Sequence, residues 1–131
     1  MLLRLDWSEM DLFGHINNVS YFKYLQASRV NLWESTGMSA YFTDHNLGPA
    51  LAKTECRFLK PLFYPGTIRI ECFVKQIRTT SFSLQHFIYN DANELCAEGE
   101  DVIVFFDYKS HKKVPLTDEL RKQLEPFLMQ D

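Results

Sequence analysis

One loop carries the residues whose types and spacing best fit a chemical role. It runs from Asp11 to Asn17, and a helical pattern begins at Asn18. The first backbone N–H groups of a helix lack internal partners and carry the positive end of its dipole, so they can stabilise an oxyanion. Beside them, the carboxylate of Asp11 could act as a nucleophile or as a base for water. Hydrolysis of a thioester needs these two things, attack at the carbonyl carbon and charge stabilisation at its oxygen.

The same loop also has a purely structural interpretation. An aspartate before a helix often only caps a turn, and His15 beside Gly14 could simply hydrogen-bond the loop. Asn17-Asn18 is a capping sequence in any protein. The spacing alone therefore leaves a catalytic and a structural role open.

A long helix must follow this loop, from about Asn18 to Thr36, with Asn17 or Asn18 as its N-cap and Gly37 at its end. The apolar residues of this helix fall on one wide arc: Tyr21, Phe22, Leu25, Leu32 and Trp33. Such an arc predicts burial on more than one side.

Alternating apolar and polar residues then predict strands. We expect them at residues 1–7, about 50–58, 68–75, 82–88 and 95–108, with a final helix from Thr117 to Leu128. Consecutive strands joined by short turns pair antiparallel, and the long helix needs a sheet to bury its apolar arc. The sequence thus predicts an α+β fold with an antiparallel five-stranded sheet wrapped around a long central helix. With no repeat or linker, residues 1–131 form one expected domain.

Composition excludes several classes of protein. The net charge is −3, from 14 basic and 17 acidic residues, so nucleic acid is not an expected partner. Three cysteines without a CxxC pair fit neither a disulfide scaffold nor a zinc site. No apolar run approaches the ~20 residues of a membrane span, and no signal peptide is recognisable, so we expect a cytoplasmic protein.

The segment WSEMDLFGHINNVSYFKYLQASR resembles the signature D-x-D-x-x-G-H-(V/I)-N-N-x-x-Y-x-x-Y-x-E-x-x-R of the hotdog-fold acyl-CoA thioesterases. Within them it is similar to the acyl-CoA thioester hydrolases related to 4-hydroxybenzoyl-CoA thioesterase. Eight positions are in register: Glu9, Asp11, Gly14, His15, Asn17, Asn18, Tyr21 and Arg29. Glu9 departs from the pattern, because many relatives have Asp there, but it lies outside the catalytic position. FLKPLFYPG and RTTSFSLQH resemble later segments of the family, so the resemblance covers about residues 2–128.

This resemblance implies a hotdog fold and hydrolysis of an acyl-CoA to a free acid and CoA, with no metal or redox cofactor. Asp11 matches the catalytic carboxylate, and the backbone N–H of Asn18 is implied to polarise the thioester carbonyl. His15, Asn17 and Tyr21 are implied to bind substrate beside them.

The resemblance also implies a homodimer or homotetramer, with the active site between two subunits. Residues near Tyr64–Thr67 or Thr79–Phe82 would then meet the substrate from the partner chain. Within the second segment, Thr80 and Ser81 are the expected substrate-binding residues.

Several points stay open. A thioesterase for acyl groups on acyl carrier protein and a non-catalytic acyl-binding protein are alternatives, although an intact Asp11 argues against the latter. Gln26 stands where relatives commonly have an acidic residue. If that carboxylate forms an ion pair, its loss weakens the pair, which is the interpretation we favour; if it helps catalysis, its loss puts activity in doubt. His86 is expected as a hydrogen-bonded core residue. Four phenylalanines could line an aromatic or a fatty acyl pocket: Phe13, Phe22, Phe58 and Phe82.

Overall fold

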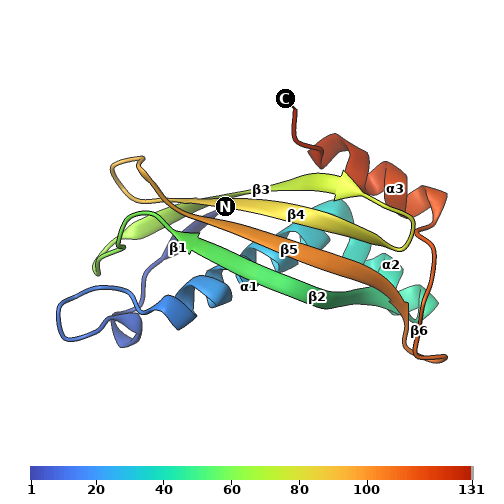
Figure 1. Ribbon diagram of the computed structural model, residues 1–131, viewed down its shortest axis with the longest axis horizontal. Coiled ribbons are helices and arrows are strands. Elements are labelled where there is room, and N and C mark those ends of the chain that lie inside the picture. Colours follow the sequence, from blue (N-terminus) through green and yellow to red (C-terminus); the bar gives the residue numbers. More distant parts are fainter. Residues whose placement is uncertain (131) are drawn as a thin grey trace.

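The computed structural model describes residues 1–130, with the backbone alone at Tyr41. The order of strands and helices along the chain is close to the one that the hydrophobic pattern predicts (Figure 1). The elements are β1 (Leu2–Arg4), η1 (Trp7–Glu9), α1 (Asn18–Thr36), α2 (Met38–His45), β2 (Leu47–Phe58), β3 (Thr67–Ile77), β4 (Ser81–Tyr89), β5 (Leu95–Asp107), β6 (Lys112–Lys113), α3 (Asp118–Leu124) and η2 (Glu125–Phe127).

The sheet has the strand order β1-β3-β4-β5-β2, and every neighbouring pair is antiparallel. All five predicted strands are present, but the five-stranded prediction was incomplete, because β6 adds a sixth strand beside β5. With only two residues, β6 is too short to produce a periodic signal. β1 and β2 form the two edges of the sheet.

One face of the sheet is covered by α1 (Figure 1). The helix and the sheet are in close contact where Leu25 of α1 meets Gly99 of β5, since a Cβ atom on Gly99 would lie 2.5 Å from Leu25 Cδ2. Leu25 has no exposed surface and shares one core cluster with Ile88 and Ala97. Gly99 therefore lets the helix approach the sheet backbone.

The ends of α1 follow the predicted caps. Asn17 is the N-cap, and its Oδ1 accepts from the Ser20 amide at 2.9 Å, while Gly37 at the C-terminal end has a left-handed φ of 78°. Within one chain, however, part of the arc that we expected to be buried lies at the surface. Phe22, which we expected in the buried arc, is 37% exposed.

The α+β class and the antiparallel sheet are confirmed, and the curled sheet is consistent with the predicted hotdog fold. α1 has 19 residues, and its description as a long central helix enclosed by the sheet stays a prediction. The sequence interpretation missed α2, which is short and directly follows the helix-ending Gly37. It also extended the last helix too far, since α3 ends at Leu124 and η2, which contains Pro126, follows.

A polar network lies inside this core. The His86 ring, fully buried as predicted, has Nδ1 at 2.8 Å from Ser28 Oγ and Nε2 at 2.6 Å from Asp101 Oδ2. Arg29 donates to the same Asp101 oxygen at 3.0 Å, and Thr54 donates to the other at 2.8 Å. Burial alone would raise the pKa of Asp101, but these hydrogen bonds and the positive charge of Arg29 outweigh it and lower that pKa.

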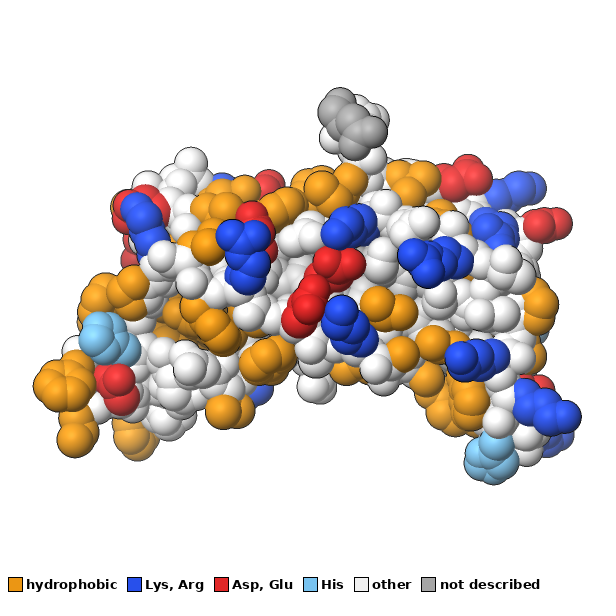
Figure 2. Space-filling model, viewed as in Figure 1, with side chains coloured by type: hydrophobic (Ala, Val, Ile, Leu, Met, Phe, Trp, Pro, Cys, Tyr) orange, Lys and Arg blue, Asp and Glu red, His pale blue; other side chains and the backbone are white. Residues whose placement is uncertain are grey.

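The opposite face of the sheet is charged. Figure 2 shows acidic and basic side chains gathered over the strands. They include two ion pairs between strands. Arg57 of β2 lies 3.7 Å from Glu98 of the neighbouring β5, and Lys75 Nζ of β3 lies 3.1 Å from Glu100 of β5, across the intervening β4. Among the helices of residues 1–130, none has the length and apolar character needed to cross a bilayer.

Candidate active site

The loop before α1 is held by backbone hydrogen bonds on two sides. Within it, Met10 pairs with Ile16 in an antiparallel bridge, and Gly14 takes a φ of 79° that permits the reversal between them. On the other side, the Ile16 amide donates to Leu62 O at 2.8 Å and the Tyr64 amide donates to Gly14 O at 3.0 Å. The loop is therefore fixed against the segment that follows β2.

Asp11 lies at the start of this loop, and its two carboxylate oxygens have different environments. Oδ1 accepts from the amides of Phe13 and His15, at 2.9 Å and 3.0 Å. Oδ2 has a longer contact of 3.6 Å with His15 Nδ1. The side chain is 45% exposed. One oxygen thus fixes the carboxylate, and the other is available to a ligand.

The N-terminus of α1 opens into the same cavity as this carboxylate. Asn17 caps the Ser20 amide, whereas the Asn18 N–H has no acceptor among the residues that the structure describes. An unpaired helix N-terminal N–H, aligned with the dipole, is a donor suited to a carbonyl oxygen that gains charge.

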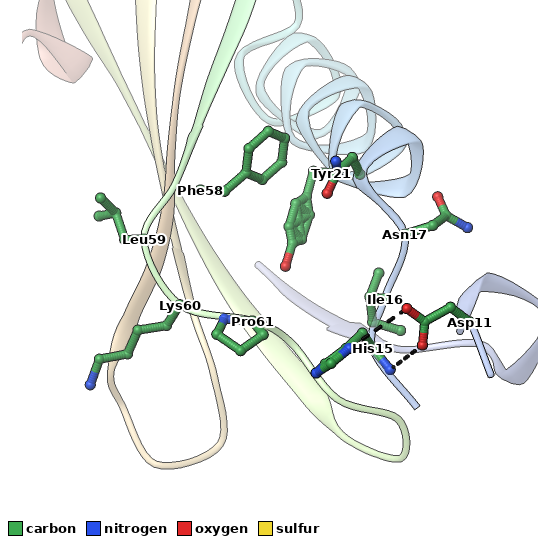
Figure 3. Close-up of a pocket in the computed structure, with 10 residues that line it drawn as sticks. Asp11, His15, Ile16, Asn17, Tyr21, Phe58, Leu59, Lys60 and Pro61 are labelled. Atoms are coloured by element: carbon green, nitrogen blue, oxygen red, sulfur yellow. Dashed lines mark hydrogen bonds and ion pairs between the residues drawn. The ribbon is translucent and has the colours of Figure 1, made fainter. Parts of the chain in front are cut away.

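A cavity of about 610 Å³ opens at this junction (Figure 3). Phe58 and Tyr21 both line it, and their rings pack against each other with centroids 4.9 Å apart. The Tyr21 hydroxyl accepts from the Leu62 amide at 3.2 Å, which fixes that ring, and burial raises the pKa of its phenol. The lining residues are Asp11, His15, Ile16, Asn17, Asn18, Tyr21, Phe58, Leu59, Lys60 and Pro61.

Five of the seven predicted site residues therefore line one cavity: Asp11, His15, Asn17, Asn18 and Tyr21. Thr80 and Ser81 do not. They lie at the turn between β3 and β4, level with Ala50 in the strand register, whereas the cavity lies at the Phe58 end of β2. Our prediction placed them in the site of a partner chain, and the single chain does not test it.

Leu59, Lys60 and Pro61 line the cavity, although we did not name them as site residues. The sequence feature that could have identified them is the FLKPLFYPG segment, which marks where β2 ends and the chain turns toward the loop. Lys60 also forms an ion pair with Glu94 at the cavity rim.

The four phenylalanines that we named as possible pocket residues lie in different places. Phe58 lines the cavity, Phe82 is buried in the other core cluster, and Phe13 and Phe22 are exposed. Gln26 borders a separate hollow that includes Lys23 and lies on the exposed side of α1. Within one chain, Gln26 is therefore not part of the cavity that contains Asp11.

The arrangement combines a fixed carboxylate, an unpaired helix N-terminal amide and an aromatic wall. Such a site can polarise a carbonyl and direct a nucleophile to its carbon. In the described part of the chain, the His, Cys, Asp and Glu side chains form no group of three or more that could hold a metal ion.

Comparisons with known proteins agree with this chemistry. Over 120 residues the chain is 24% identical to the long-chain acyl-CoA thioesterase FadM of Escherichia coli, covering 91% of each chain. It is 29% identical to the chloroplastic acyl-acyl carrier protein thioesterase ATL3 of Arabidopsis thaliana, over 94% of this chain and 65% of that protein. The solved structure of the PA2801 protein from Pseudomonas aeruginosa superposes with a TM-score of 0.83 at 27% identity, covering 93% of this chain and 94% of that one. The model of the thioesterase-like superfamily matches residues 5–124. Because this match spans most of the 131 residues, the chain belongs to the thioesterase-like superfamily.

Proposed function

We propose that this protein hydrolyses an acyl-CoA thioester to a free carboxylic acid and CoA, with Asp11 as the catalytic carboxylate and the Asn18 amide as the oxyanion donor. The observation that carries the proposal is the shared cavity of these two groups. Asp11 Oδ2 is left available by the two amides that hold Oδ1, and the Asn18 N–H has no acceptor among residues 1–130.

In the proposed reaction the thioester carbonyl oxygen accepts from the Asn18 N–H. Asp11 then takes a proton from a water molecule that attacks the carbonyl carbon, or it attacks that carbon itself. Either way the C–S bond breaks and the thiolate leaves with the bonding electron pair, later taking up a proton. In the second route water hydrolyses the acyl–Asp11 anhydride. Both routes consume one water and need no metal or redox cofactor.

The remaining cavity residues have supporting roles in this proposal. His15 and Asn17 border the reacting groups, and the facing rings of Tyr21 and Phe58 form an apolar wall. Such a wall suits the acyl chain or the pantetheine arm of the substrate.

We further propose that a second copy of the chain completes the site. β2 is a 12-residue edge strand, and pairing of two such edges about a two-fold axis is antiparallel. It would bring the Ala50 end of one protomer, with Thr80 and Ser81, toward the Phe58 end of its partner.

Exposed apolar side chains around the site support this assembly. Leu12 is fully exposed, Phe13 is 80% exposed and Phe63 is 52% exposed. Figure 2 shows apolar side chains gathered at the end of the molecule where this loop lies. A second copy would remove part of this apolar surface from water.

Hydrolysis of acyl groups carried by acyl carrier protein is a second candidate function. The likeness to ATL3 favours it, since that relative is named as an acyl-acyl carrier protein thioesterase. The reacting thioester has the same chemistry in both substrates, so the proposed roles of Asp11 and Asn18 are unchanged.

The test measures free-thiol release and product acid with the same acyl chains on CoA and on a carrier protein. We expect Asp11→Asn to lower turnover at least ~10²-fold, while Asp44→Asn, an exposed carboxylate in α2, leaves it unchanged. Equal turnover by wild type and Asp11→Asn would remove Asp11 from the mechanism. An inactive wild type on every ester would favour an acyl-binding protein.

The oxyanion donor can be removed separately. Proline is tolerated at the first position of a helix, and Asn17 already has the extended conformation that a following proline requires. Asn18→Pro deletes the N–H and should lower kcat by about 10²–10³-fold, whereas Asn18→Ala keeps the N–H and should stay near wild type. Similar losses in both variants would argue against a role for this amide.

A further inference from the structure

Glu9 is a buried carboxylate that does not line the cavity. It lies two residues before Asp11, and its side chain is only 8% exposed. Both carboxylate oxygens have partners. Oε1 accepts from the Tyr24 hydroxyl at 2.8 Å and from the Asp6 amide at 3.3 Å, and Oε2 accepts from Lys23 Nζ at 2.9 Å. The side chain of Glu9 thus joins the start of the loop to the second turn of α1.

The backbone of Glu9 joins the loop to α1 a second time. Its carbonyl oxygen accepts from both the backbone amide and the side-chain amide of Asn17, each at 2.9 Å. Asn17 is the N-cap that precedes the Asn18 amide. Glu9 and Asn17, which flank the two ends of the loop that carries Asp11, are therefore hydrogen-bonded to each other.

The loop between Glu9 and Asn17 is itself held together by backbone hydrogen bonds. Met10 pairs with Ile16, and the Asp11 amide donates to His15 O at 2.7 Å. A shift of Glu9 relative to α1 would consequently move Asp11 relative to the Asn18 amide. A displacement of about 1 Å between reacting groups can cost a factor of ~10² in rate.

The contact of the Glu9 side chain with Lys23 depends on the negative charge of Glu9. Burial alone would raise the pKa of Glu9, but hydrogen bonds from Lys23, Tyr24 and the Asp6 amide outweigh it and lower that pKa. Glu9 is therefore ionised at neutral pH. A glutamine of the same shape could still accept from Tyr24, but it would turn an amide N–H₂ toward Lys23 Nζ.

We propose that Glu9 is a positioning residue, which fixes Asp11 relative to the Asn18 amide through its contacts with Tyr24, Lys23 and Asn17 and itself touches no substrate. This inference rests on the proposed hydrolysis at Asp11. Glu9 would act on the orientation of the carboxylate, so its loss should lower kcat while substrate affinity changes little.

The kinetic test compares Glu9→Gln with Glu9→Asp, Tyr24→Phe and a control for lost stability. Val74→Ala is that control, because it shortens a fully buried side chain in β3, away from both the loop and the β2 edge. We expect Glu9→Gln to lower kcat by about 10–100-fold with KM within ~3-fold, and Glu9→Asp to recover part of the loss. Val74→Ala should keep wild-type kcat despite a lower Tm. A Glu9→Gln enzyme with wild-type kcat, or an equal kcat loss in Val74→Ala, would overturn the proposal.

A second readout separates this proposal from the proposed function. The amides of Phe13 and His15 both donate to Asp11 Oδ1, so their hydrogen exchange reports the loop directly. Glu9→Gln should speed their exchange by about tenfold, with amides of β4 unchanged. If the wild type hydrolyses no thioester but this exchange accelerates, the proposed function fails and the anchoring role of Glu9 stands. Unchanged exchange would refute that role.

Discussion

We expect Asp101→Asn to remove about 3 kcal/mol from the free energy of unfolding. Asp101 has no exposed surface, and the side chain of Arg29 is 12% exposed, so the variant leaves a guanidinium largely out of water without its counterion. Breaking a buried ion pair at one partner costs roughly 3–5 kcal/mol. We take the lower end, because an asparagine oxygen can still accept from Thr54.

The same loss can be converted to a temperature. Unfolding entropy is about 2.1 cal/mol/K per residue, so over 131 residues a loss of about 3 kcal/mol lowers Tm by about 11 °C. Urea unfolding at fixed protein concentration, followed by the fluorescence of the buried Trp33, measures the free energy directly. A loss below ~1 kcal/mol would refute the view that Asp101 compensates a buried charge.

A double-mutant cycle with Arg29→Met isolates the pair. Arg29→Met leaves Asp101 bound by His86 and Thr54, and the double variant leaves no unpaired guanidinium. We therefore expect the double variant to lose less stability than the sum of the two single variants. Additive losses would show that the pair contributes no coupling.

The pH dependence of this contribution has a definite sign. The pKa of Asp101 is lower in the folded protein than in the unfolded chain, where it is about 3.9. Ionised Asp101 therefore stabilises the fold fully above that unfolded pKa, and the contribution disappears as the pH falls through the lower folded pKa. Asp101→Asn should accordingly flatten the acid side of the stability curve.

Three further outcomes are expected. Gly99→Ala should cost about 1–3 kcal/mol in urea unfolding, because the new methyl group meets the fully buried Leu25 at 2.5 Å; a neutral variant would show that Leu25 can move aside. Asn17→Ala should cost about 1 kcal/mol by the same measurement, since it removes the cap of the Ser20 amide; no loss would mean that water replaces the cap. Burial raises the pKa of the Cys72 thiol to about 12, so alkylation at pH 8, followed by mass spectrometry, should be at least ~10²-fold slower than in urea; equal rates would contradict its burial.

Local patterns predicted most of the elements. The alternation of Ile68, Ile70 and Cys72 placed β3 correctly within two residues at each end, because one face of that strand is buried. α1 began and ended where Asn17 and Gly37 predicted, since capping is a property of the local chain. β6 and α2 were not predicted, because elements this short show little hydrophobic periodicity.

The residues of the candidate site show the same difference between local and long-range information. Asp11, Asn18 and Tyr21 lie within one short stretch of sequence, so the motif brought them together without knowledge of the fold. Lys60 reaches the cavity only because β2 ends there, and Asp101 meets Arg29 only through the pairing of β5 with its neighbours. Contacts between distant segments depend on strand register, which a single sequence does not define.

The contact between Leu25 and Gly99 also has an evolutionary consequence. A side chain at position 99 and a full-sized leucine at position 25 cannot both fit, because the helix and the sheet already touch there. The two positions should therefore change together during divergence, with a methyl group gained at 99 matched by one lost at 25, as in a Leu25→Val/Gly99→Ala pair. What selection preserves at this crossing is the summed volume of two residues that lie more than seventy positions apart in the chain.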